Sequence, residues 1–209
     1  MTTSGKLTVT TFVTLDGVYQ APGGPDEDRD GGFRHGGWVV PYIDDDMFGF
    51  INQVFTRADA FILGRRTYEI FASHWPRVTD GNDPVASALN RLPKHVASRT
   101  LKHAEWRGTT ITREIVKQAA ELKRRHVREV QVHGSGELIQ TLLTNELVDE
   151  LNLLLFPVVL GSGKRLFGSG AVPAAFAPAG ARTTSTGVVI TTYRRNGKPT
   201  YGAVGLETA

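Results

Sequence analysis

The sequence alternates short β-branched runs with amphipathic helical patterns over its first two thirds, and this alternation restricts the fold more than any other feature. The strand patterns occupy residues 7–13, 60–63, 94–98 and 127–133. Two helical patterns begin near Asp44 and Thr67, and two more occupy residues 112–125 and 138–147. Parallel strands require helical connections of this length, so the sequence predicts an α/β fold with a largely parallel sheet covered on both faces.

The last third of the chain has a different pattern. Strand-like runs at 150–159, 186–193 and 201–204 follow one another without a long helix between them. This arrangement predicts an antiparallel edge on the parallel sheet. The run at 150–159 is more apolar than a solvated edge strand, so we expect it within the sheet or at a subunit interface.

Composition narrows the class of protein. A length of 209 residues suits one domain spanning 1–209. No apolar run approaches the roughly 18 residues of a membrane helix, and no secretion signal is visible at the N-terminus. The net charge of +3 is small, and the basic runs lack interleaved aromatic residues, which argues against nucleic-acid binding. The absence of Cys favours a cytoplasmic protein, and the six His residues lack metal-ligand spacing, so we predict no metal.

Three predicted strand ends carry unusual residues. Asp16 follows the first strand, residues 64–67 follow the second, and a Gly-Ser-Gly sequence at 134–136 follows the strand at 127–133. Ligands of open α/β sheets bind at such ends, so we expect one cleft, covered by the Gly- and Pro-rich loop at 20–37. A glycine loop that opens a helix suits a phosphate, and a plain tight turn is the alternative.

Further polar residues fall near the same predicted edge. Arg65 and Arg99 follow neighbouring strands, and a guanidinium suits a phosphate monoester. Either arginine alone is more often a surface residue, but their joint placement favours a ligand. His133 is the one histidine expected near a ligand, where it either contacts the ligand or only packs. The sequence at 161–164 resembles part of a P-loop, but it lacks the required earlier glycine and the Ser or Thr that binds magnesium. It therefore predicts a β-turn, with an anion contact as the alternative.

Several motifs occur together in one order: TLDG at 14–17, LGRRTYE at 63–69, VHGSGEL at 132–138, LVDEL at 147–151 and FPVVLGSGKRLF at 156–167. In this order they resemble the dihydrofolate reductase superfamily, and more narrowly its RibD C-terminal reductase-like branch. The resemblance spans residues 7 to about 193. It implies a dihydrofolate-reductase-like three-layer αβα fold, with a mostly parallel mixed sheet and an antiparallel C-terminal edge.

The resemblance also implies NADPH as the hydride donor and a small-molecule substrate. It places the backbone of Val13 near the nicotinamide, with Trp38 flanking the ring. The residues implied on the adenosine side are Gly64, Arg65, Thr67, Ser98 and Arg99. Those implied around the diphosphate are Gly134, Ser135, Gly136, Glu137 and Leu138. Asp16 or His133 is the candidate to relay a proton, and family analogy implies a homodimer.

Two departures from the family pattern affect the expected function. The first helix carries apolar residues at 48–51 where dihydrofolate reductases have a carboxylate, which argues against folate reduction. His133 replaces an acidic residue that is usual in riboflavin-pathway reductases. We therefore expect an NADPH-dependent reductase of a small polar heterocyclic or sugar-derived substrate, similar to 5-amino-6-(5-phosphoribosylamino)uracil reductase. The alternative is a non-catalytic NADP-binding homodimeric module.

Overall fold

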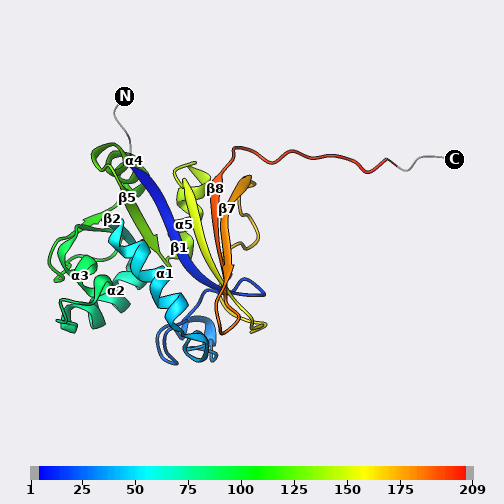
Figure 1. Ribbon diagram of the computed structural model, residues 1–209. Coiled ribbons are helices and arrows are strands. Elements are labelled where there is room, and N and C mark those ends of the chain that lie inside the picture. Colours follow the sequence, from blue (N-terminus) through cyan, green and yellow to red (C-terminus); the bar gives the residue numbers. More distant parts are fainter. Residues whose placement is uncertain (1–4, 206–209) are drawn as a thin grey trace.

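A computed structural model describes residues 5–205 and is built around one eight-stranded sheet (Figure 1). Its strands are β1 (Lys6–Thr14), β2 (Ala58–Gly64), β3 (Lys94–Ala97), β4 (Thr109–Thr112), β5 (Glu129–His133), β6 (Glu150–Phe156), β7 (Phe176–Thr183) and β8 (Val189–Arg195). The strand order is β4-β3-β2-β5-β1-β6-β8-β7. The six strands from β4 to β6 are parallel, whereas β8 runs antiparallel to both β6 and β7. This confirms the mixed α/β fold with an antiparallel C-terminal edge.

Five α-helices accompany the sheet in the described residues. They are α1 (Asp45–Thr56), α2 (Arg65–His74), α3 (Pro84–Arg91), α4 (Ile115–Arg125) and α5 (Gly136–Thr144). Residues on α4 and α5 pack against one face of β1, β5 and β6. The helix α1 covers the opposite face of β5 and β6, while α2 and α3 pack with its C-terminal end against β2 and β3. No helix in residues 5–205 is long and apolar enough to cross a membrane.

The observed elements correct several boundaries. Residues 201–204 form no strand, and Tyr201 and Val204 are 85% and 96% exposed, because no neighbouring strand pairs with them. The helix expected at 112–125 begins only at Ile115, since Thr112 ends strand β4. Arg65 is the first residue of α2 rather than a turn residue. The strand expected at 150–159 ends at Phe156 and lies inside the sheet, between β1 and β8.

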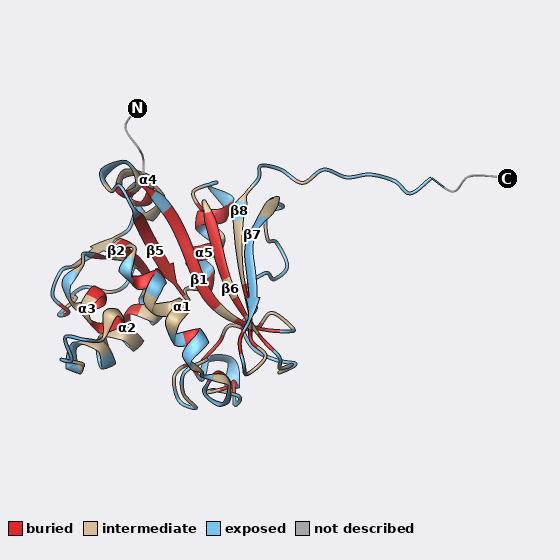
Figure 2. Ribbon diagram, in the orientation of Figure 1, coloured by how far each residue is buried: buried red, intermediate tan, exposed pale blue. Residues whose placement is uncertain are grey.

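The central strands β1 and β5 differ strongly between their two faces. Their paired residues alternate in register, Leu7 with Val130 and then Thr8 with Gln131. The apolar pairs contribute to the core under α4 and α5. The polar residues point to the face covered by α1, although the strands themselves are buried (Figure 2). Buried parallel strands are normally apolar on both faces, so this polar face requires a local explanation.

The long loop at 20–37 closes on itself at a narrow neck. The Gly37 N–H donates to the Ala21 carbonyl at 2.8 Å, and the Val39 N–H donates to the Pro22 carbonyl at 3.1 Å. Trp38 Nε1 adds a 2.8 Å hydrogen bond to the carbonyl of Gln20. The loop therefore has an Ω form, with its two ends fixed next to each other.

Candidate active site

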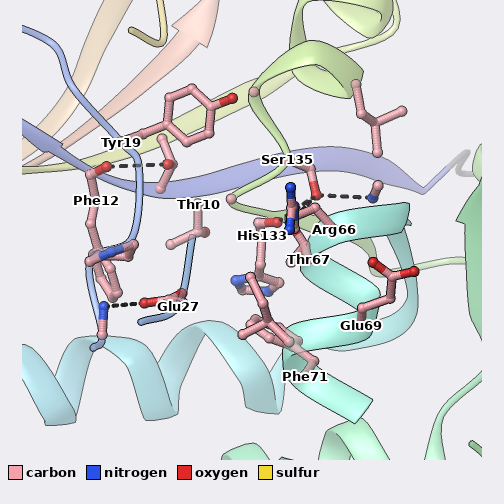
Figure 3. A pocket seen from close by; sticks show the side chains of 18 of the residues that line it. Thr10, Phe12, Tyr19, Glu27, Arg66, Thr67, Glu69, Phe71, His133 and Ser135 are labelled. Carbon is pink, nitrogen blue, oxygen red and sulfur yellow. Dashed lines mark hydrogen bonds between the residues drawn. The ribbon is translucent and has the colours of Figure 1, made fainter. Parts of the chain in front are cut away.

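A cleft of about 1440 Å³ opens at the carboxyl ends of β1, β2, β3 and β5. It lies between α1, α2 and the start of α5, and the loop at 20–37 contributes to its wall (Figure 3). Eleven of the fourteen predicted site residues line it: Gly64, Arg65, Thr67, Ser98, Arg99, His133, Gly134, Ser135, Gly136, Glu137 and Leu138. The cleft thus opens at the edge of the sheet where the predicted strands end.

The glycine loop at 134–136 is joined to the turn between β2 and α2. Ser135 has a left-handed φ of 59°, and its Oγ accepts the Gly64 N–H at 3.0 Å. The same hydroxyl lies 2.8 Å from Thr67 Oγ1. At Gly136, an added Cβ would lie 2.3 Å from Tyr19 Cζ, so a larger residue there would displace the Tyr19 ring. Two strand-to-helix turns thus form one rigid wall, with the N-terminus of α5 at the cleft.

Three predicted residues lie outside the cleft lining. The Val13 side chain is buried in the core that faces α4 and α5, although the prediction for Val13 concerned its backbone. Trp38 is buried in the second core cluster, where its ring meets Phe156 edge to face at 5.2 Å. The aromatic ring of Trp38 therefore helps to fix the base of the covering loop.

Asp16 is the third predicted residue outside the cleft lining, and it organises the turn after β1. Its Oδ1 accepts the Thr14 hydroxyl at 2.6 Å, and its Oδ2 accepts the Gly161 N–H at 2.9 Å and lies 3.3 Å from Arg165. The hydrogen bond from Thr14 is the main cause that lowers the pKa of Asp16 to about 2. A carboxylate this acidic is ionised at neutral pH, and its contacts hold two loops together.

His133 lines the cleft as a buried, neutral imidazole. Its ring stacks on Phe55 with centroids 4.4 Å apart, and burial lowers its pKa to about 3. Its Nε2 lies 3.1 Å from the Gln131 Oε1, which can only accept, so Nε2 carries the proton. No hydrogen bond reaches Nδ1 from residues 5–205. The structure therefore presents His133 as an acceptor through Nδ1 rather than as an acid.

The orientation of Gln131 follows from its other contacts. Its Nε2 donates to the Val54 carbonyl at 2.6 Å and to Glu129 Oε2 at 2.8 Å. Arg57 Nε donates to the other oxygen of Glu129 at 2.7 Å. Successive cleft-facing side chains of β5 thus form a polar ladder, defined here as Glu129, Gln131 and His133. This ladder fixes one tautomer of the histidine at the cleft.

Arginines gather at the ends of β2, β3 and β4. Arg65 is engaged, with its Nε 2.7 Å from Glu69 and its NH1 2.6 Å from the Thr100 hydroxyl. Arg99 and Arg113 also line the cleft and make no hydrogen bond or ion pair within residues 5–205. Sequence reasoning missed Arg113 because it missed β4, the four-residue strand that ends one position before it.

A second charged group at the cleft was also missed. Lys164 Nζ lies 2.9 Å from Asp28 Oδ2 and 2.8 Å from Asp30 Oδ2, and Arg66 approaches Asp28 at 3.7 Å. These contacts link the loop after β6 to the covering loop. The sequence offered an anion contact at 161–164 only as an alternative to a β-turn, and it had no means of showing which distant carboxylates meet Lys164. No group of three His, Asp or Glu able to hold a metal occurs in the described chain.

Most of the chain matches a known protein family. The RibD C-terminal domain profile matches residues 5–190. The chain belongs to the RibD C-terminal domain family. The uncharacterized protein YyaP of Bacillus subtilis (strain 168) is 28% identical over 187 residues, covering 88% of this chain and 92% of YyaP.

Solved structures of RibD-like proteins share the fold. A protein of Shewanella sp. PV-4, assigned provisionally to riboflavin biosynthesis, has a TM-score of 0.64 at 22% identity, with 91% of this chain and 99% of that chain covered. A pyrimidine reductase-like protein of Corynebacterium diphtheriae has a TM-score of 0.62 at 13% identity, with 92% of each chain covered.

A third structural relative is bifunctional. It is the diaminohydroxyphosphoribosylaminopyrimidine deaminase/5-amino-6-(5-phosphoribosylamino)uracil reductase of Thermotoga maritima, with a TM-score of 0.60 at 14% identity. The match covers 92% of this chain and 57% of that protein. Membership of the RibD C-terminal family, together with this shared fold, supports a reductase of the RibD kind.

Proposed function

We propose that this protein is an NADPH-dependent reductase that transfers hydride to a small polar heterocyclic or sugar-derived substrate. The observation that carries the proposal is the wall formed by Gly64, Thr67 and Ser135, which sets the N-terminus of α5 at a cleft rimmed by arginines. Backbone N–H groups at a helix N-terminus suit a diphosphate, and guanidinium groups suit a phosphate monoester.

The arginines at the adenosine end supply the basis for choosing NADPH over NADH. The two cofactors differ by one ribose phosphate, so discrimination requires groups that recognise that dianion. Arg99 and Arg113 are exposed at neighbouring strand ends and have no protein partner in residues 5–205. Arg65 already binds Glu69 and Thr100, so it must exchange or share these contacts to bind phosphate.

The cofactor is tested by titrating Arg65→Ala, Arg99→Ala and Arg113→Ala with NADPH and NADH, using nicotinamide fluorescence. A charge-assisted hydrogen bond contributes about 1.5–3 kcal/mol, which is roughly a ten- to hundredfold change in affinity. We expect a loss of that size for NADPH and little change for NADH. Equal losses for both cofactors would mean that the arginine supports the fold or the shared diphosphate.

The reaction is tested with 5-amino-6-(5-phosphoribosylamino)uracil, the compound named for the Thermotoga maritima relative. Oxidation of NADPH that depends on this compound would support the proposal. The second candidate is a non-catalytic NADP-binding module, and it is favoured by the side chains of α1 at the cleft, where Met47, Phe48 and Ile51 are apolar. Stoichiometric NADPH binding without oxidation across related pyrimidine and pterin compounds would favour that candidate.

We also propose that the protein is a homodimer that uses no nucleic-acid partner and acts in the cytoplasm. Family analogy supports the homodimer. The modest net charge of +3 supports the absence of a nucleic-acid partner. Light scattering at micromolar concentration is the test of assembly, and a monomeric mass would contradict it.

A further inference from the structure

Reduction of a carbon–heteroatom double bond needs a proton as well as a hydride, and neither predicted donor can supply it. Asp16 lies outside the cleft lining and is ionised at neutral pH. His133 is neutral there, and its one N–H proton is held by Gln131. The carboxylates that line the cleft are the next candidates.

Most carboxylates of the cleft are bound to a cation, exposed to solvent or placed at a helix N-terminus. Asp28 and Asp30 bind Lys164, and Glu69 binds Arg65. Asp80 is exposed, and Asp83 caps the N-terminus of α3, where the ionised form is favoured. Glu137 is exposed in the first turn of α5, beside the backbone that suits a diphosphate. Its position therefore belongs to the proposed diphosphate site.

Glu27 differs from all of these. It is half-buried in the covering loop and lines the cleft. Its Oε2 accepts the backbone N–H groups of Gly23 and Gly24, the latter at 3.1 Å. Figure 3 shows Glu27 at the cleft with one of these contacts dashed. Its Oε1 has no hydrogen-bond partner in residues 5–205, and no cation pairs with it there. The loop thus holds one oxygen in place and leaves the other free to carry a proton.

We propose that Glu27 is the proton donor of the reduction, an inference that rests on the proposed function. NADPH, when bound, would supply the hydride that bonds to the carbon of the substrate double bond. The π electrons move to the heteroatom, which takes the proton from Oε1 of Glu27. NADP⁺ and a Glu27 carboxylate result, and the carboxylate regains its proton from water.

The surroundings of Glu27 raise its pKa above the ordinary value of a glutamate. Burial is the main cause that raises its pKa, and the negative charge of Asp28 adds to the rise. The N–H groups of Gly23 and Gly24 act in the opposite direction. The nearby cations do not cancel the effect, because Lys164 and Arg66 are both bound to Asp28. His133, which also lines the cleft, is uncharged at neutral pH.

The first test does not require turnover. Carboxyl ¹³C NMR of the intact protein, free and with NADPH, reports the protonation of Glu27 as pH changes. We expect Glu27 to titrate above its ordinary value of 4.5. A titration at or below 4.5 in both states would overturn the proposal. This measurement stands even if the uracil compound is not reduced, so failure of the proposed substrate and failure of the donor are distinguishable.

The second test uses NADPH oxidation with 5-amino-6-(5-phosphoribosylamino)uracil. Glu27→Gln keeps an oxygen that can accept both glycine N–H groups, so we expect the loop to keep its form. We expect kcat to fall about 100-fold or more, with KM and NADPH affinity changed by less than about threefold. The decline of wild-type kcat at high pH should disappear in the variant, and Glu27→Asp should recover part of the rate.

A matched control lies next to Glu27 in the same loop. Asp26 is exposed, is paired with Arg29 and does not line the cleft, so Asp26→Asn should leave kcat and its pH profile unchanged. A Glu27→Gln variant that keeps kcat within about threefold would overturn the proposal. So would one that keeps the high-pH decline, or one that loses NADPH affinity as much as kcat.

Discussion

The two faces of β1 and β5 are both buried, but one face carries apolar side chains and the other carries polar side chains. Toward α4 and α5 the paired residues are apolar, as in Val9 opposite Val132. Toward α1 they are polar, as in Thr10 opposite His133. The apolar face removes hydrocarbon from water and stabilises the fold. Every polar group on the other face requires a partner, so that face is organised by hydrogen bonds and leads into the cleft.

Shortening a side chain on the apolar face should give the largest loss of stability. Leu122 on α4 is 3% exposed and packs in the core under β1 and β5. We expect Leu122→Ala to lower the free energy of unfolding by about 2–5 kcal/mol through lost burial and a residual cavity. Urea unfolding measures the loss, and NADPH affinity under native conditions is the control. A loss below about 1 kcal/mol would mean that this face is loosely packed.

Breaking the polar ladder should cost less stability but change the site. Gln131→Leu leaves the Val54 carbonyl and the His133 N–H without their present partner, which should cost about 1–3 kcal/mol. Nitrogen-15 NMR of the imidazole should show loss of the single Nε2–H tautomer. In the double variant Gln131→Leu/His133→Phe, the two costs should not add, because the second change removes a group already left unpaired. Simple additivity would contradict a coupled ladder.

The polar face should also make stability depend on pH. Burial lowers the pKa of His133 from 6.5 to about 3, so the unfolded chain binds more protons between these values. Stability should therefore be complete above pH 6.5 and fall as pH decreases, by up to about 1.4 kcal/mol per pH unit. Urea unfolding at pH 7 and 5 should differ by about 2 kcal/mol in the wild type. His133→Phe should lose most of that difference, whereas Leu122→Ala should keep it.

The smallest effect is expected at Asp16, at the end of β1 but outside the cleft. Asp16→Asn keeps one acceptor oxygen and loses the charge beside Arg165, so about 1 kcal/mol of stability should be lost. NADPH affinity and kcat should stay within about threefold of wild type. A large fall in kcat with normal stability would instead support Asp16 as the proton donor.

The sequence predicted the main strands, the helices and the edge of the sheet where the cleft lies, because these depend on periodicity and on local turn chemistry. It missed α3, although Asp83 and Pro84 form a recognisable helix start, because the helix has only eight residues. It missed β7 because Pro178 and Gly180 are poor strand formers, tolerated here at an edge with a bulge. The sequence of β5, Glu129 to His133, alternates polar and apolar residues, and this alternation predicts that its three polar side chains lie on one face.

Two parts of the site could not be predicted from the sequence. Lys164 meets Asp28 across 136 positions, and only the fold decides that contact. Glu27 lies in a loop without periodicity, among several other acidic residues, and nothing local separates it from Asp26 or Asp28. What distinguishes it is the absence of a cation beside it, which is a property of the folded chain.

The neck of the covering loop joins the two ends of that segment, whereas the residues between them make separate contacts. The hydrogen bonds between residues 20–22 and 37–39 close the loop. Asp28 and Asp30 in its interior bind Lys164, and Phe33 packs in the second core cluster. Loop-closure entropy changes only slowly with length, so positions without such contacts can be exchanged at little cost in that entropy. A graft of another member's 23–35 segment that keeps Glu27, Asp28, Asp30 and Phe33 is therefore the corresponding route to a changed specificity.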